Sequence, residues 1–286
     1  MYSIRSVFRR ALSSPCPLCG LGARGGDLCD GCQQELMPHP DGHDRCRQCG
    51  AYASADAPAG AQSNAQTDAQ TDAQTGVQTA AQTHKQTPTQ AHTFGGPCRA
   101  CRAGAPAYDQ TVVAIDYAFP GDMLVRALKE RGRLELAGLF GRMIWQGVVA
   151  RENSLPALDL LIPVPSSVAS LGRRGFNPAA EITRQIARQG GLPIRRDWLR
   201  RTRESALQKA LGATDRKRNV QGLYAAPDGL PAVCVGLVDD VMTTGSTMHQ
   251  AALALRSGGV AAVVALVGAR TPVHATAHVW QNGDHV

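Results

Sequence analysis

The stretch VCVGLVDDVMTTGSTMHQAALAL, residues 233–255, decides the fold of this chain. It begins as an apolar strand, reaches two adjacent carboxylates at Asp239 and Asp240, and enters a helix through the turn TTGST. Backbone N–H groups at the start of a helix, with the helix dipole behind them, bind anions such as phosphate. The stretch therefore predicts a strand, an anion-binding turn and a helix in succession.

The side chains of the TTGST turn (residues 243–247) and of the acidic pair predict a sugar phosphate as the ligand. Gly245 allows the backbone to approach a phosphate closely. Hydroxyl donors surround it at Thr243, Thr244, Ser246 and Thr247. An ionised carboxylate accepts hydroxyl hydrogens well, so acids one sugar length from the phosphate suit a diol, as in ribose 5-phosphate. The alternative is an ordinary strand-to-helix turn whose acids bind no ligand.

An ATPase is a competing interpretation, because a Walker B strand also ends in acidic residues. An ATPase of that kind needs the partner motif G-x-x-x-x-G-K-[ST], whose backbone and lysine hold the nucleotide phosphates. The sequence contains no such motif. Its absence excludes the ATPase interpretation.

Strands alternate with amphipathic helices from Tyr108 onward. We expect strands at residues 111–119, 158–165, 231–240 and 260–271, and helices at residues 121–132, 134–153, 177–191 and 246–259. This alternation predicts an α/β fold with a mostly parallel sheet and flanking helices. In such sheets ligands bind at the carboxyl ends of the strands, where the acidic pair falls.

Eight of the nine cysteines form four C-x-x-C pairs. The pairs are Cys16/Cys19, Cys29/Cys32, Cys46/Cys49 and Cys98/Cys101. Two thiolates on one tight turn chelate a single ion, and two such pairs complete a tetrahedral site, so we expect two structural Zn²⁺ ions. The simplest arrangement joins the first pair with the second and the third with the fourth, while a cross-braced arrangement stays open.

A disulfide framework is the alternative use of these cysteines, and it requires an oxidising compartment. The N-terminal residues contain no continuous apolar core of a signal peptide, and no stretch is long enough to span a membrane. We therefore expect a cytoplasmic protein with zinc rather than disulfides. Cys234, inside an apolar strand, is expected to be a small buried hydrophobic residue.

A low-complexity segment separates the third C-x-x-C pair from the fourth. Residues 65–90 contain six Gln-Thr steps and almost no large apolar side chain, so we expect a disordered Gln/Thr/Ala segment from about residue 52 to 93. The predicted organisation is a small Cys-rich zinc-ribbon domain at residues 1–107, interrupted by this segment, and an α/β domain at residues 108–286.

Positive charge is concentrated in one part of the chain. Residues 173–218 hold thirteen Lys and Arg against four Asp and Glu, whereas the whole chain has a net charge of +7. Such asymmetry indicates a polyanionic partner, either a nucleic acid or a phosphorylated small molecule. A solvated arginine-rich face is the other interpretation.

Several motifs of the sequence together resemble those of known protein families. LVDDVMTTGST is similar to the motif that binds 5-phosphoribosyl 1-pyrophosphate in type I phosphoribosyltransferases. Together with the C-x-x-C pairs, LIPVPSS, RRGFNPAAEI and RKRNVQGLY, it resembles the ComF family of competence proteins, which includes the gluconate-utilisation-associated relatives. The resemblance implies a type I phosphoribosyltransferase-like sheet behind an N-terminal double zinc ribbon.

The resemblance also implies roles for individual residues. Asp239 and Asp240 would hold the ribose hydroxyls and be the catalytic pair, and residues 243–247 would hold the 5-phosphate. The pyrophosphate loop would be Pro163, Val164, Pro165 and Ser166, with Mg²⁺ accompanying 5-phosphoribosyl 1-pyrophosphate. Pro178 departs from the family, whose members often have Gln there.

Two functions of different classes stay open after the resemblance. One is a protein that binds 5-phosphoribosyl 1-pyrophosphate and handles single-stranded DNA during natural transformation, with a DNA-uptake helicase as a further partner. The other is an active phosphoribosyltransferase on an unidentified acceptor in nucleotide or carbohydrate metabolism, in which Arg173 and Arg174 would neutralise the leaving pyrophosphate. The fold alone does not decide between them.

Overall fold

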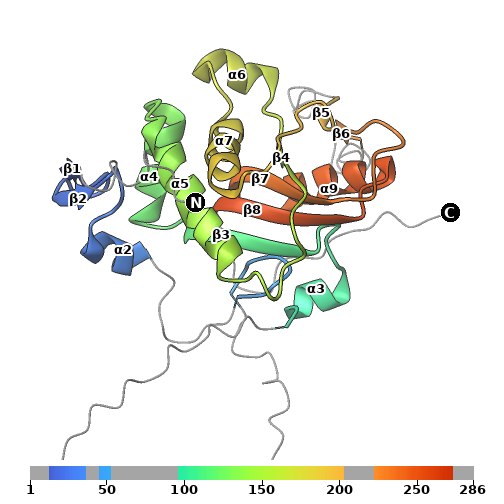
Figure 1. Ribbon diagram of the computed structural model, residues 1–286, viewed down its shortest axis with the longest axis horizontal. Helices are drawn as coiled ribbons and strands as arrows, with labels where there is room; N and C mark the ends of the chain where they lie inside the picture. The colour runs from blue at the N-terminus through green and yellow to red at the C-terminus, as the bar shows by residue number, and fades with distance from the viewer. Residues whose placement is uncertain (1–12, 37–44, 53–95, 203–221, 273–286) are drawn as a thin grey trace, which may run out of the picture.

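A computed structural model of the protein describes residues 13–36, 45–52, 96–202 and 222–272 (Figure 1). The low-complexity segment predicted at residues 52–93 lies outside the described residues except for Tyr52. So does the part of the basic segment from residue 203 to 218.

The centre of the fold is a parallel sheet of four strands. They are β3 (Gln110–Asp116), β8 (Ala262–Arg270), β7 (Cys234–Met242) and β4 (Leu160–Pro163), in the order β3-β8-β7-β4. Every pairing is parallel, and Val238 in β7 aligns with Pro163 on one side and with Leu266 on the other. The predicted α/β fold with a parallel sheet is confirmed.

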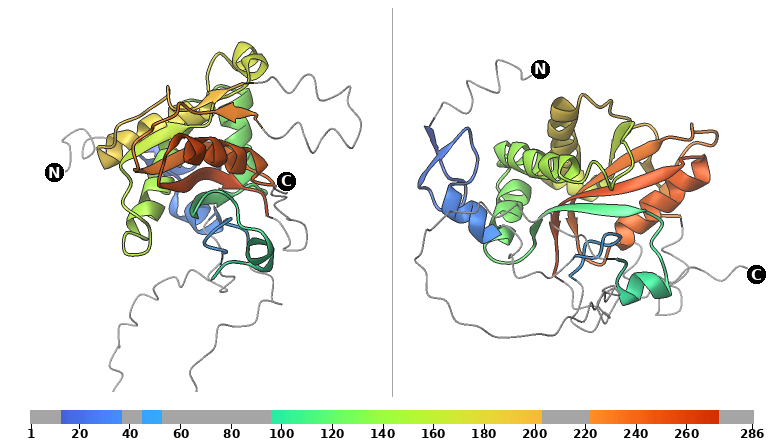
Figure 2. Two further views of the ribbon diagram at one scale, coloured as in Figure 1. Left: turned by 90° about the vertical axis from the view of Figure 1, so that its right-hand side faces the viewer. Right: turned by 60° about the horizontal axis from the view of Figure 1, so that its bottom comes forward.

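Helices cover both faces of the sheet (Figures 1 and 2). On one face lie α4 (Gly121–Glu130), α5 (Glu135–Val149) and α7 (Pro178–Gly190), and α9 (Ser246–Gly258) lies on the other. Because side chains alternate along a strand, Val264 and Leu266 join the core under α4, α5 and α7, while Ala265 packs with α9. The sheet is therefore apolar on both faces, as parallel sheets are.

Local capping sets the helix boundaries around the candidate site. The Asn177 side chain accepts a hydrogen bond of 3.0 Å from the Ala179 N–H, Pro178 begins α7, and Gly191 ends it in a left-handed conformation. A short helix that the sequence analysis missed, α6 (Val168–Arg174), begins after Ser167, whose side chain accepts from the Ser170 N–H.

The close contact between α5 and α7 depends on a glycine. A Cβ atom at Gly141 would lie 2.5 Å from Gln185 Cβ, whereas at Gly138 its nearest neighbour would be Nη1 at the far end of the Arg142 side chain, 3.3 Å away. We expect Gly141→Ala to lower the free energy of unfolding by about 1–3 kcal/mol through overpacking. Gly138→Ala, in the same helix, should be neutral or stabilising by up to about 1 kcal/mol. Urea unfolding of both variants tests this, and equal effects would contradict it.

The Cys-rich segments form two small units. The first contains the β1 (Ser13–Pro15) and β2 (Gly22–Arg24) hairpin and α2 (Asp30–Leu36). The second contains residues 45–52 and α3 (Arg99–Ala103). Two further short strands, β5 (Arg200–Arg201) and β6 (Tyr224–Ala225), pair with each other and were not predicted.

The second Cys-rich unit is docked on strand β3 (Figure 2). The Thr111 N–H donates to the Arg47 carbonyl at 2.9 Å, and the Thr111 hydroxyl donates to the Gln48 carbonyl at 2.5 Å. Arg45 forms an ion pair of 2.8 Å with Asp116, and the Tyr52 hydroxyl donates to the same carboxylate at 2.5 Å. This unit therefore lies directly against the sheet that carries the candidate site.

Among the described helices, none is long and apolar enough to cross a membrane.

Candidate functional site

The residues predicted to bind the sugar phosphate lie along one edge of the sheet. Pro163, at the end of β4, aligns with Val238 in β7, and the Val164 N–H donates to the Val238 carbonyl at 2.9 Å. The carboxyl ends of both strands therefore meet where Asp239 follows Val238. The fold brings the loop at residues 163–166, the acidic pair and the TTGST turn to the same edge, where open parallel sheets bind ligands.

The two acids differ in their surroundings. Strand β7 continues two residues beyond the pair, to Met242, so successive side chains project to opposite faces of the sheet. Asp240 projects toward α4, where its Oδ2 forms an ion pair of 3.0 Å with Lys129 Nζ. The sequence analysis ended this strand at Asp240. It also missed Lys129 as a partner of Asp240, because no local sequence pattern links a residue of α4 to β7.

Asp239 is the acid with an available oxygen. Its Oδ1 accepts a hydrogen bond of 2.9 Å from the Asp240 N–H, and among the described residues its Oδ2 forms no ion pair of the kind that joins Asp240 to Lys129. Burial, reinforced by the neighbouring Asp240 charge, raises the pKa of Asp239 well above its usual range. A cation or hydroxyl donor beside Oδ2 would compensate that cost, so Asp239 is the stronger candidate ligand residue.

The TTGST turn has the geometry of an anion-binding loop. Gly245 is buried with φ +82°, a left-handed conformation that favours glycine, and it precedes α9 as the N-cap. The four hydroxyl side chains around it are exposed. Within the described residues, the N–H groups of Thr243, Thr244 and Gly245 donate no hydrogen bond, while the Ser246 N–H donates to Thr244 Oγ1 at 3.3 Å. Three unpaired N–H groups at a helix N-terminus provide donors for a phosphate.

A buried arginine behind the turn was also missed by the sequence analysis. Arg270, the last residue of β8, is 0% exposed. Its Nη1 donates to the carbonyls of Met242 at 3.2 Å and Thr271 at 3.1 Å, and also to that of Thr243. Its Nε donates to the Cys49 carbonyl at 3.1 Å. An arginine after an apolar strand gives no sequence signal of such a role, because all four carbonyls come together only in the fold.

The eight paired cysteines form two groups of four. The first Cys cluster is Cys16, Cys19, Cys29 and Cys32, and the second Cys cluster is Cys46, Cys49, Cys98 and Cys101. Within each group the sulfurs all lie within 4.8 Å of one another. The simplest predicted pairing is therefore confirmed, and each group has the donor set of a closed Cys₄ metal site.

The two Cys clusters differ in exposure and in chemistry. All four thiols of the second Cys cluster are buried, whereas Cys19 in the first is exposed and Cys29 and Cys32 are half-buried. A hydrogen bond with the Cys101 thiol lowers the pKa of Cys98 to about 6 and lowers that of Cys46 well below its usual range. Hydrogen bonds with other thiols raise the pKa values of Cys49 and Cys101, so the fit to a Zn²⁺ ion rests on the four converging sulfurs. Cys234 is buried, as predicted.

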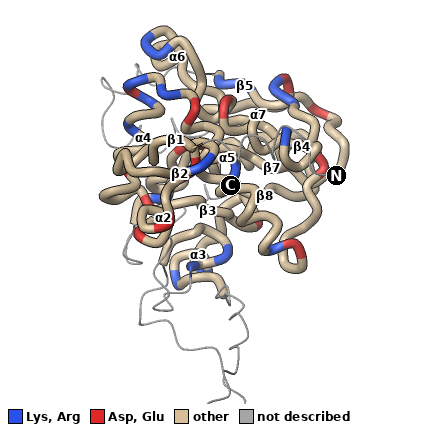
Figure 3. The backbone as a smooth tube through the Cα atoms, turned by 60° about the vertical axis from the view of Figure 1, so that its left-hand side comes forward, with Lys and Arg blue, Asp and Glu red and all other residues tan. Residues whose placement is uncertain are grey.

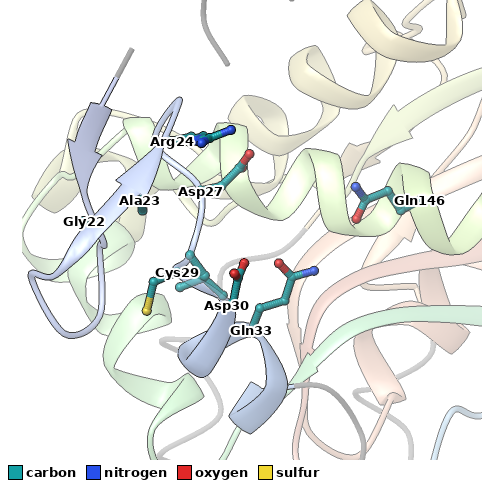
Figure 4. Close-up of a pocket in the computed structure, with 9 residues that line it drawn as sticks. Gly22, Ala23, Arg24, Asp27, Cys29, Asp30, Gln33 and Gln146 are labelled. Carbon is teal, nitrogen blue, oxygen red and sulfur yellow. The ribbon is translucent and has the colours of Figure 1, made fainter. Parts of the chain in front are cut away.

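A cavity of about 550 Å³ opens beside the first Cys cluster, between β2, α2 and α5 (Figure 4). Figure 4 shows polar side chains around it, including those of Asp27, Asp30 and Gln146. The lining residues are Gly22, Ala23, Arg24, Asp27, Leu28, Cys29, Asp30, Gln33 and Gln146. None of them belongs to the predicted sugar-phosphate site, so this cavity is separate from the sheet edge.

The described part of the basic segment, residues 173–202, lies on α6, on α7 and around β5. Figure 3 shows Lys and Arg on α6 and near β5 toward the same end of the molecule. Some of these charges are already partnered, since Arg184 pairs with Glu181 and the Arg195 guanidinium lies 5.7 Å from the Trp198 ring centre. Arg173, Arg196 and Arg200 are exposed and available to a polyanion.

The fold and these sites define an α/β protein whose parallel sheet carries the TTGST turn at its carboxyl edge and whose N-terminal part carries two Cys₄ groups. The chain is 32% identical over 169 residues to "DNA utilization protein YhgH" of Salmonella typhi, covering 58% of this chain and 74% of that protein. The Escherichia coli protein of the same name is 32% identical over 169 residues, with coverage of 58% and 74%. "Competence protein F" of Haemophilus influenzae is 29% identical over 168 residues, with coverage of 57% and 73%.

The chain therefore belongs to the family of competence protein F and DNA utilization protein YhgH. The resemblance to ComF proteins found in the sequence is confirmed. No protein-family model matches the chain.

Proposed function

We propose that this protein binds 5-phosphoribosyl 1-pyrophosphate at the carboxyl edge of its sheet and acts in the handling of single-stranded DNA. One observation carries the proposal: an open carboxylate oxygen of Asp239 shares the edge with the three unpaired N–H groups of the TTGST turn. A ribose 5-phosphate presents hydroxyls and a phosphate that match these two groups. The names of the relatives, which refer to competence and to DNA utilization, support the DNA role.

The residues present also fit Mg²⁺. Magnesium prefers oxygen ligands and binds through one or two carboxylates together with substrate phosphates. Asp239 Oδ2 would hold the ion, and Asp240 is less suited because Lys129 already pairs with it. The ion would supply charge neutralisation for the pyrophosphate, while the loop at residues 163–166 and the TTGST turn position the two ends of the ligand.

Isothermal titration of the purified protein tests the ligand. We expect 5-phosphoribosyl 1-pyrophosphate to bind only with Mg²⁺ present, and ribose 5-phosphate to bind more weakly because it lacks the pyrophosphate group. Mg²⁺ without ligand is the control for metal binding elsewhere. If 5-phosphoribosyl 1-pyrophosphate gives no binding signal at millimolar concentration, the proposed ligand is wrong.

A second titration, with a single-stranded oligonucleotide, tests the DNA role. We expect binding with little sequence preference, and the logarithm of affinity should fall linearly with the logarithm of salt concentration, by about 0.7 per phosphate contacted. Replacing Arg196 and Arg200 with Gln should flatten that slope and leave affinity for 5-phosphoribosyl 1-pyrophosphate unchanged. Stacking should contribute little, since Phe176 is half-buried and Trp198 is buried. Absence of oligonucleotide binding at low salt would contradict the DNA role and make the arginines a solvated face.

A further inference from the structure

The position of Arg270 links the TTGST turn to the second Cys cluster. Its Nε binds the carbonyl of Cys49, a member of that cluster, and its Nη1 binds the carbonyls of Met242 and Thr243, which lead into the turn. A single rigid guanidinium therefore touches the backbone of two sites that belong to distant parts of the sequence. Because the guanidinium is planar, the positions of these carbonyls depend on one another.

The peptide geometry of the turn explains what this contact does. In a trans peptide the C=O and the following N–H point in opposite directions. When the carbonyls of Met242 and Thr243 point at Arg270, the N–H groups of Thr243 and Thr244 point away from it. Those N–H groups donate no hydrogen bond within the described residues, so the guanidinium orients them for an external acceptor. Each peptide dipole then has its negative end on Arg270 and its positive end toward an anion.

The charge of Arg270 is unusually placed. The side chain is fully buried and forms no ion pair with a carboxylate among the described residues, and its Nη2 has no partner there. A buried cation of this kind is costly unless negative charge lies near it. Two groups could supply this negative charge. Four thiolates holding one divalent metal would have a net charge of −2, and a phosphate would lie on the far side of the turn.

We infer that Arg270 is a positioning residue that aims the TTGST turn at its phosphate ligand and couples ligand affinity to the metal state of the second Cys cluster. Loss of the metal would remove the negative charge of the metal-bound thiolates and would free the Cys49 backbone. The Cys49 carbonyl, which holds the Nε side of the guanidinium, would then no longer be fixed. The turn then loses the group that orients its N–H donors. Coupling of this kind is reciprocal, so bound ligand must retain metal in the second Cys cluster. The first Cys cluster makes no contact with Arg270 and is the internal control.

The coupling to the ligand rests on the proposed function, but the link between Arg270 and the turn does not. The test compares the zinc-loaded wild type with Arg270→Lys, which keeps the charge but not the planar fork. Arg151→Lys is the matched control for disturbance of the second Cys-rich unit, because Arg151 is also buried and donates to the carbonyl of Thr111, the β3 residue on which that unit is docked. Zinc content and circular dichroism establish that each variant is folded.

Three measurements decide the inference. We expect Arg270→Lys to weaken Mg²⁺-dependent binding of 5-phosphoribosyl 1-pyrophosphate at least tenfold, and Arg151→Lys to change it less than twofold. Hydrogen exchange of residues 243–247 in the unliganded protein should be faster in Arg270→Lys than in Arg151→Lys. In wild-type protein, transfer of zinc to a colorimetric chelator should show two phases, and ligand should slow only the phase of the second Cys cluster.

The outcomes separate the two proposals. If wild-type protein binds no 5-phosphoribosyl 1-pyrophosphate, the proposed function and the ligand coupling both fall, while faster exchange in Arg270→Lys still establishes the link to the turn. If the ligand binds but slows both zinc phases equally, or neither, the coupling is wrong. Unchanged exchange at residues 243–247 in a folded Arg270→Lys overturns the positioning role. If Arg270→Lys does not fold, the wild-type zinc measurement alone decides the coupling.

Discussion

Replacement of both acids, Asp239→Asn with Asp240→Asn, is expected to abolish binding of 5-phosphoribosyl 1-pyrophosphate and to leave the fold intact. Each substitution removes a charge-assisted acceptor worth about 1.5–3 kcal/mol, which together correspond to a loss of about a hundredfold or more. The single variants should not be equal. Asp239→Asn should have the larger effect, because Asp239 has the open oxygen, whereas Asp240 pairs with Lys129.

Asp159→Asn is the matched control for this experiment. Asp159 is a carboxylate at the other end of β7, where its Oδ2 accepts a hydrogen bond of 2.7 Å from the Cys234 N–H. Its replacement should affect stability but not ligand affinity. Titration calorimetry and thermal unfolding measure the two quantities, and wild-type affinity in the double variant would place the ligand elsewhere.

The raised pKa of Asp239 adds a pH dependence to the same measurement. Burial and the Asp240 charge keep the Asp239 carboxyl protonated to a higher pH than usual, and only the ionised form accepts from hydroxyls or holds Mg²⁺. Ligand affinity should therefore rise as pH increases through this raised pKa. In Asp239→Asn that part of the pH dependence should disappear, whereas Asp159→Asn should retain it.

Metal removal is the second change with a large expected effect. Purified protein should contain about two Zn²⁺ ions per chain, since two closed Cys₄ groups account for eight thiols. The first Cys cluster should lose its ion first, because Cys19 is exposed and the second Cys cluster is buried. Loss of the second ion should be far more damaging, since residues 45–52 are hydrogen-bonded to Thr111 and paired with Asp116 on β3.

Two single substitutions separate these contributions. Cys19→Ser should reduce zinc to about one ion per chain with a small decrease in Tm, and Cys98→Ser should produce a much larger decrease. Elemental analysis, chelator kinetics and thermal unfolding provide the readouts. A soluble, folded, metal-free protein with four disulfides in its mass spectrum would refute the zinc assignment, and equal losses of Tm would refute the difference between the clusters.

The parts of the fold that local chemistry determines were predictable from the sequence. The apolar stretches, and the glycines at which helices end, predicted the four parallel strands and their helices. The C-x-x-C spacing predicted two groups of four sulfurs. The TTGST turn was found because glycine and hydroxyl residues are adjacent in the chain. The resemblance to ComF proteins followed from the same motifs, and it is confirmed by relatives that share about 30% identity.

Contacts between distant segments were not predictable. Lys129 and Asp240 are more than a hundred residues apart, and their pairing depends on how α4 packs on the sheet. Arg270 reaches Cys49 only because β3, β8 and the second Cys-rich unit lie together. Helix α6 has a capping serine, but seven residues contain too little periodicity to be recognised. Strand β7 also continues through Val241 and Met242, which the sequence analysis left outside the predicted strand.

The second Cys cluster also determines where this chain tolerates engineering. Cys49 and Cys98 are 49 positions apart in sequence, yet their sulfurs lie 3.8 Å apart, so the described stretches on either side of residues 53–95 meet at nearly one point. Because both ends belong to the same Cys cluster, the entropic cost of closing a connection between them grows only with the logarithm of its length, about 0.6 kcal/mol per doubling. A fluorescent reporter domain with neighbouring termini, inserted between these two cysteines, should therefore lower the free energy of unfolding only slightly.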